Sequence, residues 1–290
     1  MMESYEIRAY AKVNLGLDVI KRLDNGYHQV KMVMQSIGIY DELILQKTTG
    51  GIVITTDSGE IPSDESNLAF RAARLMIEKY GLTDGIRIHL KKNIPVAAGL
   101  AGGSSDAAAV FQGMNTLFGL GLDLSTLMEL GVKIGADVPY CILGGTALAE
   151  GIGEVLTALP PAPDGILLVV KPEFAVSTKA VYERLDAEGI AVHPDIDGMV
   201  RAIKDNNLDG VVSRMGNVLE SVTEKMHPRI TEIKNLMLEM GARNSLMSGS
   251  GPTVFGVFSA QGIAWAAYEA VLEKGLAKQL FLTDFVDPKA

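Results

Sequence analysis

Hydrophobic and polar residues alternate with a period of two over much of the first half of the chain. This spacing is typical of strands, because successive side chains of a strand point to opposite faces. It predicts strands at 33–40, 43–47 and 86–90, and Asp24-Asn25-Gly26 predicts a turn. In the segment 11–19 one face carries Val13, Leu15, Leu17 and Val19, and the other carries Lys12, Asn14, Gly16 and Asp18.

Other segments show the spacing of helices or of buried strands. A helix is predicted at 66–80 with its end at Gly81, and another at 228–240 with its end at Gly241. A third helix follows a glycine-rich stretch, and its apolar stripe includes Val110, Met114, Leu117 and Phe118. The run 166–170 predicts a buried strand, and strand, turn, strand, helix and strand complete the chain. This mixed order favours the α+β class over a regular parallel array.

Three prolines, Pro160, Pro161 and Pro163, gather before Asp164-Gly165. Proline and glycine mark turns and loops, so this cluster is the best candidate for a linker. It predicts two domains, at 1–160 and 161–290. The length of 290 residues is enough for both.

Composition narrows the classes of function. Apolar residues make up 48% and charged residues 21%, as in a soluble globular protein. The net charge of −9 and the lack of a dense Lys/Arg run argue against nucleic acid and anionic membranes as partners. No apolar segment is long enough to span a bilayer. The single cysteine, Cys141, excludes a disulfide within the chain and fits a cytoplasmic location.

The glycine- and serine-rich stretch from Pro95 to Ser105 lies between a predicted strand and a predicted helix. Small residues let a backbone approach a ligand closely, and a helix N-terminus offers N–H groups to an anion. The stretch therefore predicts a phosphate-binding loop, although neither the Walker A lysine nor the dinucleotide-binding spacing is present. The alternative is a plain connection with Ser104 or Ser105 as N-cap. Its residues are Pro95, Val96, Ala97, Ala98, Gly99, Leu100, Ala101, Gly102, Gly103, Ser104 and Ser105.

A phosphate loop without its own lysine needs a cation and a base from elsewhere. Lys12 is a candidate cation, although an edge lysine in solvent would show the same spacing. Asp137, in a proline-stiffened apolar stretch, is a candidate for accepting the proton of a hydroxyl, or alternatively a turn or capping residue. Ser248-Gly249-Ser250-Gly251 is either part of the phosphate site or a tight hairpin. Trp265 is expected in the core.

Ala11-Lys12-Val13-Asn14-Leu15, the 95–105 loop and Ser248-Gly249-Ser250-Gly251 together resemble, in order and spacing, the three motifs of the GHMP kinases. The resemblance covers nearly the whole chain. It implies a two-domain fold with an N-terminal domain like domain 2 of ribosomal protein S5 and a ferredoxin-like C-terminal domain. It also implies ATP as phosphoryl donor with Mg²⁺, the 95–105 loop as ATP site, and Lys12 and Asp137 as the catalytic pair.

Asn25-Gly26-Tyr27-His28, Gly135-Ala136-Asp137-Val138-Pro139 and Gly144-Gly145-Thr146 resemble family members whose acceptor is a small cytidine-diphosphate-linked alcohol of isoprenoid-precursor biosynthesis. That resemblance implies substrate contacts by Asn14, His28 and Thr178, with Tyr27 and Tyr182 beside the cytosine ring. Two alternatives remain: another GHMP kinase of the mevalonate or homoserine type, and a non-catalytic binding protein on the same fold.

Overall fold

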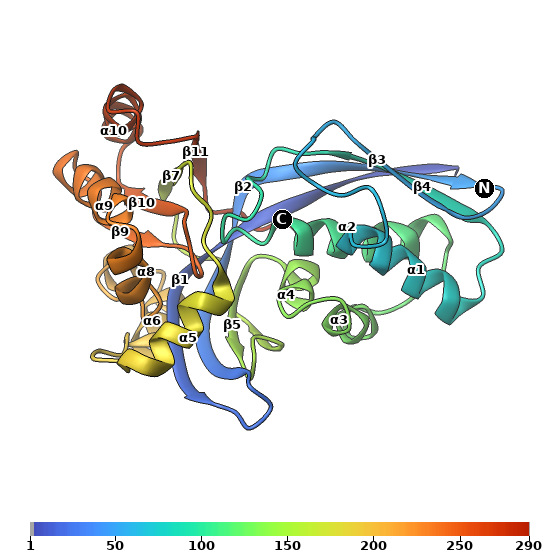
Figure 1. Ribbon diagram of the computed structural model, residues 1–290, viewed down its shortest axis with the longest axis horizontal. Coiled ribbons are helices and arrows are strands. Elements are labelled where there is room, and N and C mark those ends of the chain that lie inside the picture. The colour runs from blue at the N-terminus through green and yellow to red at the C-terminus, as the bar shows by residue number, and fades with distance from the viewer. Residues whose placement is uncertain (1–2, 290) are drawn as a thin grey trace. The chain divides into compact units, whose positions relative to one another are not determined.

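The structure is a computed structural model that describes residues 3–289 (Figure 1). Its chain divides into two compact units that interleave along the sequence. Unit 1 comprises residues 3–11, 39–96 and 101–144, and unit 2 comprises residues 12–38, 97–100 and 145–289. Two long strands, β1 (Ser4–Arg22) and β2 (His28–Thr48), contribute residues to both units. The segment 95–105 is likewise divided between them.

Unit 1 contains one end of a mixed sheet. The strand order is β3-β4-β2-β1, where β3 is Ile52–Thr56 and β4 is Gly85–Lys91. β2 and β4 are antiparallel, in a register that pairs Leu43 with Leu90, and β3 runs parallel to β4. The two strands predicted at 33–40 and 43–47 are one continuous strand.

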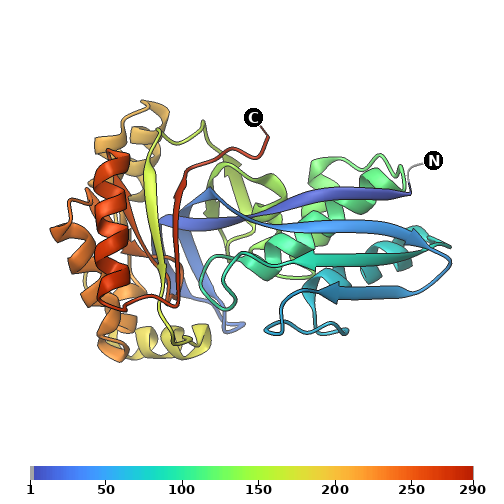
Figure 2. The same cartoon turned by 90° about the horizontal axis from the view of Figure 1, so that it is seen from above.

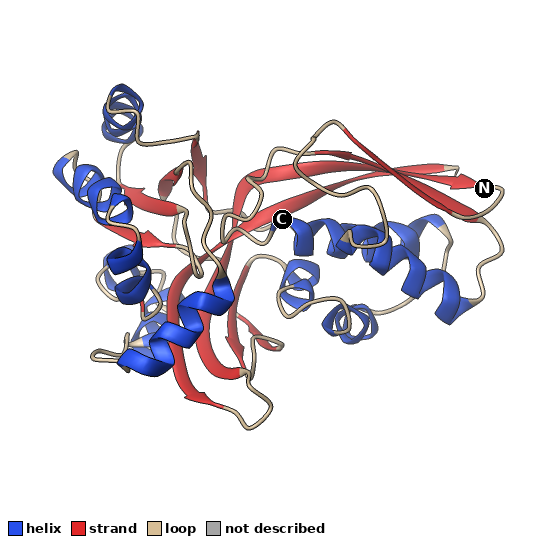
Figure 3. Cartoon of the chain, viewed as in Figure 1, coloured by secondary structure: helices blue, strands red, loops and turns tan. Residues whose placement is uncertain are grey.

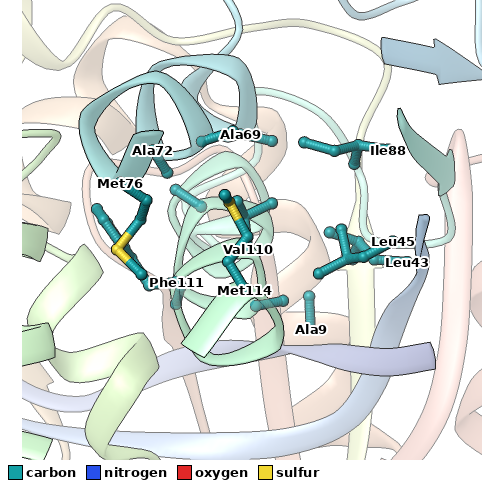
Figure 4. Close-up of a cluster of buried hydrophobic side chains, with 14 of the residues drawn as sticks. Ala9, Leu43, Leu45, Ala69, Ala72, Met76, Ile88, Val110, Phe111 and Met114 are labelled. Carbon is teal, nitrogen blue, oxygen red and sulfur yellow. The ribbon is translucent and has the colours of Figure 1, made fainter. Parts of the chain in front are cut away.

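Four helices of unit 1 lie on one face of this sheet (Figures 1 and 2). They are α1 (Leu68–Tyr80), α2 (Gly102–Leu117), α3 (Leu124–Val132) and α4 (Val138–Leu143). α1 ends where predicted, because Gly81 adopts the left-handed conformation that glycine tolerates best. Figure 4 shows the core between helices and sheet, which buries Ala9, Leu43, Leu45, Ala69, Ala72, Met76, Ile88, Val110, Phe111 and Met114.

Unit 2 contains the other end of the mixed sheet. β5 (Thr146–Glu150) is antiparallel to β2, and β6 (Val155–Ala158) is antiparallel to β5. The two-residue strand β8 (Gly216–Asn217) runs parallel to β1 at Gly16 and Leu17. Leu15, Leu17 and Val19 are buried, as the alternation predicts, but Lys12, Asn14 and Asp18 on the other face are buried too.

A second, antiparallel sheet belongs wholly to unit 2. Its order is β11-β7-β10-β9, and helices α9 and α10 cover one face of it (Figures 2 and 3). The strands are β7 (Ile166–Lys171), β9 (Asn244–Met247), β10 (Val254–Phe258) and β11 (Gln279–Asp284). The helices of unit 2 are α5 (Thr178–Glu188), α6 (Ile196–Lys204), α7 (Leu208–Val212), α8 (Glu220–Met226), α9 (Arg229–Glu239) and α10 (Gln261–Glu273).

The mixed α+β class and most predicted elements are confirmed, but the placement of Trp265 in the core was wrong. Its side chain is 52% exposed and stacks on Tyr268 along the outer surface of α10. The domain boundary predicted at residue 160 stays a prediction. It cuts the chain once, whereas each compact unit comprises several separate segments. Within residues 3–289, no helix combines the length and apolar character that crossing a membrane requires.

Candidate functional site

The N-terminus of α2 carries the second half of the glycine-rich loop. Its N-cap is Ala101, which has the left-handed backbone angles φ 60° and ψ 24° and no side-chain hydrogen bond to the helix. Ser104 and Ser105 lie inside the first turn of α2, and the Ser105 hydroxyl donates to the Tyr10 carbonyl at 2.7 Å. The alternative that either serine caps the helix was therefore wrong. The first N–H groups of α2 keep the arrangement that binds anions.

Asp137 occupies the N-cap position of the short helix α4, but its side chain makes no capping hydrogen bond. Pro139 lies in the first turn and is buried. Among residues 3–289 the structure shows no hydrogen bond or ion pair to the Asp137 carboxylate. The Asp137 side chain therefore does not cap α4, because a capping carboxylate would accept from the N–H groups of the helix it begins, but the residue does lie in the turn before the helix.

The Asp137 segment packs on the beginning of α2. The Ser105 hydroxyl lies 3.4 Å from the thiol of Cys141, one turn along α4 from Asp137. A Cβ added to Gly135 would lie 3.9 Å from the Ser104 hydroxyl. An uncapped helix N-terminus and a carboxylate with unused acceptor capacity thus lie on neighbouring segments of unit 1. Cys141 is half-buried at this contact.

A buried ion cluster joins residues on both sides of the loop, and no sequence pattern indicates it. Lys92 donates to Asp41 and, at 2.6 Å, to Asp106 in α2. All three side chains are at most 4% exposed. Asp41 also accepts from the backbone N–H groups of Asn93 (2.6 Å) and Ile94 (2.8 Å). The cluster ties together the middle of β2, the chain just before buried Pro95 and half-buried Val96, and the first turns of α2.

The charges of this cluster do not balance. Burial alone would lower the pKa of Lys92, but the attraction of Asp106 and Asp41 outweighs it and the pKa is raised. Burial, helped by the nearby Asp41 charge and opposed by Lys92, raises the pKa of Asp106 to about 7. One oxygen of Asp106 has no hydrogen-bond partner among residues 3–289. Lys92 therefore neutralises carboxylates and is not the cation that the phosphate loop lacks.

Lys12, in unit 2, is buried with 4% exposure, so the alternative of an edge lysine in solvent was wrong. Its ammonium donates to the side-chain oxygen of Asn14 at 2.7 Å, and its backbone N–H donates to the Leu100 carbonyl at 3.1 Å. Asn14 is 1% exposed and its amide lies 3.3 Å from the sulfur of Met32. Lys12 and Asn14 thus form a buried polar pair beside the first half of the loop.

The segment 248–251 holds that first half in place. The Ser248 hydroxyl donates to the Gly99 carbonyl at 2.9 Å, and the Thr253 N–H donates to the Ala98 carbonyl at 3.4 Å. Gly99 has φ +78°, and a Cβ there would come within 2.3 Å of the Ser248 carbonyl oxygen. The segment is also a hairpin connection between β9 and β10, so the two readings of this motif are compatible.

Two further polar side chains support the same hairpin. Asn217 donates to the carbonyls of Met247 (2.8 Å) and Gly249 (2.7 Å). The sequence pointed to neither contact, because Asn217 lies 30 residues from Met247. The hydroxyls of Thr178 and Ser250 are 2.7 Å apart, which links one predicted substrate residue to the hairpin.

The residues expected at the cytosine ring lie on the β1–β2 turn and on α5. The rings of His28 and Tyr182 are in tilted contact, with centroids 4.6 Å apart and an interplanar angle of 31°. The Nε2 atom of His28 lies 2.7 Å from Asp186. Tyr27 is 59% exposed on the turn. The structure therefore brings His28 and Tyr182 together, whereas Tyr27 presents its ring to solvent.

Comparison with known proteins gives the family. Residues 67–145 match the family described as GHMP kinases N terminal domain, and residues 190–276 match GHMP kinases C terminal. A protein of Lachnospira eligens named 4-diphosphocytidyl-2-C-methyl-D-erythritol kinase is 53% identical over 288 residues, which cover 99% of this chain and 100% of that one. A protein of the same name from Lachnoclostridium phytofermentans is 52% identical and covers 99% of both chains.

Solved structures agree. A crystal structure of 4-(cytidine 5'-diphospho)-2C-methyl-D-erythritol kinase superposes with a TM-score of 0.83 at 33% identity, over 97% of this chain and 100% of that one. A homoserine kinase from Cytophaga hutchinsonii has a TM-score of 0.79 at 24% identity, over 99% and 95% of the two chains, and shares the fold. The two-domain fold expected from the three motifs is thereby confirmed, and the chain belongs to the GHMP kinase family.

Proposed function

We propose that this chain transfers the γ-phosphoryl group of ATP to the 2-hydroxyl of 4-diphosphocytidyl-2-C-methyl-D-erythritol, a step of non-mevalonate isoprenoid-precursor biosynthesis. The observation that carries the proposal is the pairing, within unit 1, of an uncapped α2 N-terminus with the unpartnered carboxylate of Asp137. The helix N-terminus can bind a phosphate, and the carboxylate can accept the proton of a hydroxyl group. Relatives that match this chain over its whole length are named for the same reaction.

The donor site is assigned to the loop from Pro95 to Ser105. In unit 1, the N–H groups of Gly102, Gly103 and Ser104 begin α2 without a capping side chain. Backbone N–H groups and the positive end of the helix dipole stabilise phosphate oxygens. In unit 2, residues 97–100 are held by hydrogen bonds to Ser248 and Thr253, so this half of the loop is pre-organised.

Asp137 and Lys12 are assigned the catalytic roles. Asp137 accepts the proton of the acceptor hydroxyl, a role for which its carboxylate has free acceptor capacity. Lys12 stabilises the charge that develops on the transferred group. Its hydrogen bond to Asn14 uses one of three ammonium donors and orients the remaining two. Positioning and electrostatic stabilisation account for most of the acceleration of such a reaction.

Mg²⁺ is proposed to enter with ATP and to neutralise phosphate charge. Within residues 3–289 no group of three or more His, Cys, Asp or Glu side chains could hold a metal ion. This donor set fits Mg²⁺, which usually keeps several waters and binds through one or two protein oxygens plus substrate phosphates. The Asp137 carboxylate and the Ser104 hydroxyl, which lies near Gly135, are two protein oxygens of unit 1 that could take part in such binding.

The acceptor is assigned to unit 2. His28 offers an imidazole edge to a pyrimidine, and Tyr27 and Tyr182 offer aromatic faces. Thr178, bonded to Ser250, and Asn14, bonded to Lys12, offer polar groups to the rest of the acceptor. The phosphorylated product keeps the cytidine diphosphate moiety, so it would make the same contacts before its release.

A coupled assay of ADP release tests the proposal. The purified chain is incubated with MgATP and, separately, with the cytidylated acceptor, mevalonate, homoserine or no acceptor. We expect turnover with the cytidylated acceptor alone and a mass increase of one phosphoryl group on it. Turnover with mevalonate or homoserine instead would favour another kinase of the family. No turnover with any acceptor, together with measurable ATP binding, would favour a non-catalytic binding protein.

A further inference from the structure

One face of α5 carries a row of three polar side chains. Thr178, Tyr182 and Asp186 follow one another at intervals of four residues, a spacing that places side chains on the same face of a helix. The Thr178 hydroxyl is hydrogen-bonded to that of Ser250, and the Tyr182 ring packs against His28 in a tilted arrangement. Asp186 continues the row, although nothing in the sequence motifs assigns it a role.

We propose that Asp186 is a positioning residue that makes His28 selective for cytosine over uracil. The inference rests on the proposed function, because it takes His28 as the residue that meets the base. The inference adds Asp186 as the residue that determines which base the site accepts. The carrying observation is the contact between Asp186 and the Nε2 atom of His28.

The contact between Asp186 and His28 is short, and neighbouring side chains restrict both groups. One carboxylate oxygen of Asp186 lies 2.7 Å from Nε2 of His28, whose side chain is 9% exposed. The other oxygen lies 3.4 Å from Arg22, so a second charged group helps to orient the carboxylate. The Tyr182 ring packs against the imidazole in a tilted arrangement, with 4.6 Å between centroids. A packed ring with one nitrogen bonded has little rotational freedom left.

The carboxylate also decides the tautomer of His28. An ionised carboxylate only accepts hydrogen bonds, so Nε2 must carry the hydrogen. The neutral imidazole then has its lone pair on Nδ1, because the bond made by one ring nitrogen sets the state of the other. Within the described part of the chain no donor is bonded to Nδ1. His28 therefore offers one acceptor of defined direction.

Cytosine and uracil differ at the atom that such an acceptor would test. Cytosine carries an amino donor at C4, whereas uracil carries a carbonyl acceptor at the same position. An acceptor at Nδ1 bonds to the amino group and is repelled by the carbonyl. A site that hydrogen-bonds one substrate group discriminates strongly, because the wrong partner leaves a polar group unpaired.

Asp186→Asn is the informative variant. The asparagine has nearly the same shape, but its amide can offer either an oxygen or an NH₂ group to Nε2, so it no longer fixes the tautomer. We expect the ratio of kcat/KM for the cytidine- and uridine-diphosphate-linked acceptors to fall on the order of tenfold, the effect of one hydrogen bond. The KM for ATP should not change. Asp186→Glu, which keeps an acceptor-only carboxylate, should restore part of the ratio.

Glu183→Gln is the matched control. Glu183 lies on the same helix, its side chain is 66% exposed, and its ion pair with Lys179 is 3.8 Å long. The ratio should stay at the wild-type value in this variant. Thermal unfolding of each variant shows whether the helix is intact.

Binding of CDP and UDP alone, measured by calorimetry, separates this inference from the proposed function. We expect the wild type to prefer CDP and Asp186→Asn to lose most of that preference. An unchanged preference in Asp186→Asn would overturn the inference and leave the kinase activity standing. A wild type that binds CDP selectively but does not phosphorylate the cytidylated acceptor would contradict the proposed function and leave the role of Asp186 standing. Equal binding of CDP and UDP by the wild type would overturn the inference.

Discussion

The hydroxyl of Ser248 donates a hydrogen bond to the carbonyl of Gly99 at 2.9 Å, across 149 residues of chain. Ser248 is fully buried, and the bond joins the third family motif to the first half of the glycine-rich loop. A buried hydrogen bond with this geometry orders the loop before any ligand arrives. The close approach is possible only because Gly99 has no side chain.

Gly99→Ala should therefore distort the loop. The new Cβ would meet the Ser248 carbonyl oxygen at 2.3 Å, at a residue whose φ is +78°. We expect a loss of roughly 2–4 kcal/mol in the free energy of unfolding, from left-handed strain and the clash together, and a higher KM for ATP.

Gly119→Ala is the control for that variant, because Gly119 has φ +63° with open space around it. It should cost only about 1–2 kcal/mol, the strain of a left-handed alanine, and leave the KM for ATP unchanged. Urea unfolding and steady-state kinetics measure both effects. Equal losses in the two variants would show that the contact with Ser248 is unimportant.

Asp137→Asn should abolish turnover without loss of stability. Its carboxylate makes no hydrogen bond within residues 3–289, so folding does not depend on its charge. Removal of a general base typically lowers kcat by about 10²–10⁴-fold, while ATP binding should remain.

Asp123→Asn is the control, a substitution expected to affect stability rather than turnover. Asp123 caps α3 by accepting from Thr126, and hydrogen bonds from Thr126 and Ser125 lower its pKa. That variant should lose some thermal stability and keep its kcat. Near-normal turnover in Asp137→Asn would contradict the catalytic role.

The ion cluster should make stability depend on pH. Burial raises the pKa of Asp106 from 3.8 to about 7 in the folded state. Between about pH 4 and about pH 7 the folded chain therefore holds a proton that the unfolded chain has lost, so the free energy of unfolding falls as the pH rises. Asp106→Asn cannot ionise and should flatten this part of the profile.

Urea unfolding at about pH 5 and about pH 8 measures that slope. Asp64→Asn is the control, because Ser66 lowers the pKa of Asp64 and this carboxylate stays ionised in the folded state throughout the range. The profile of Asp64→Asn should match that of the wild type. A slope that persists in Asp106→Asn would assign the pH dependence to other groups.

Two alanines of the loop adopt left-handed backbone conformations that glycine prefers, Ala97 at φ 51° and Ala101 at φ 60°. Ala101→Gly should relieve strain and leave the free energy of unfolding unchanged or raise it by about 1 kcal/mol. Ala98 is buried and has no positive φ, so Ala98→Gly should destabilise by roughly 1 kcal/mol. Thermal unfolding compares the two, and the reverse order of stabilities would contradict the strain argument.

His28→Ala should weaken the cytidylated acceptor and leave ATP binding intact. We expect the KM for the acceptor to rise about tenfold, the effect of one lost hydrogen bond, with little change in the KM for ATP. His89→Ala is the control, since His89 is exposed on β4, where its ring bonds Thr55 at 3.0 Å. Equal losses for acceptor and ATP in His28→Ala would mean that His28 acts through the structure.

Much of the fold follows from local patterns. Period-two alternation predicts β4 and the buried positions of β1, and a glycine in the left-handed region ends α1 as expected. The prediction that Trp265 lies in the core was wrong. An aromatic residue among alanines indicates a core position, but the sequence does not show whether that face of the helix is covered. The single long strand β2 was divided in two, because the pattern cannot show that pairing continues through Asp41, which the buried Lys92 neutralises.

The amino-acid sequence by itself determined the family, the loop and the identities of Lys12 and Asp137 as candidate catalytic groups, because these depend on residue types at fixed spacings. Only the tertiary structure decided that Lys12 is buried on Asn14, that Ser104 and Ser105 are not caps, and that Asp186 holds His28. Each of these depends on which side chains meet, often across more than a hundred residues. The loop, whose sequence indicates only a general anion-binding site, is thus held by residues that lie far from it along the chain.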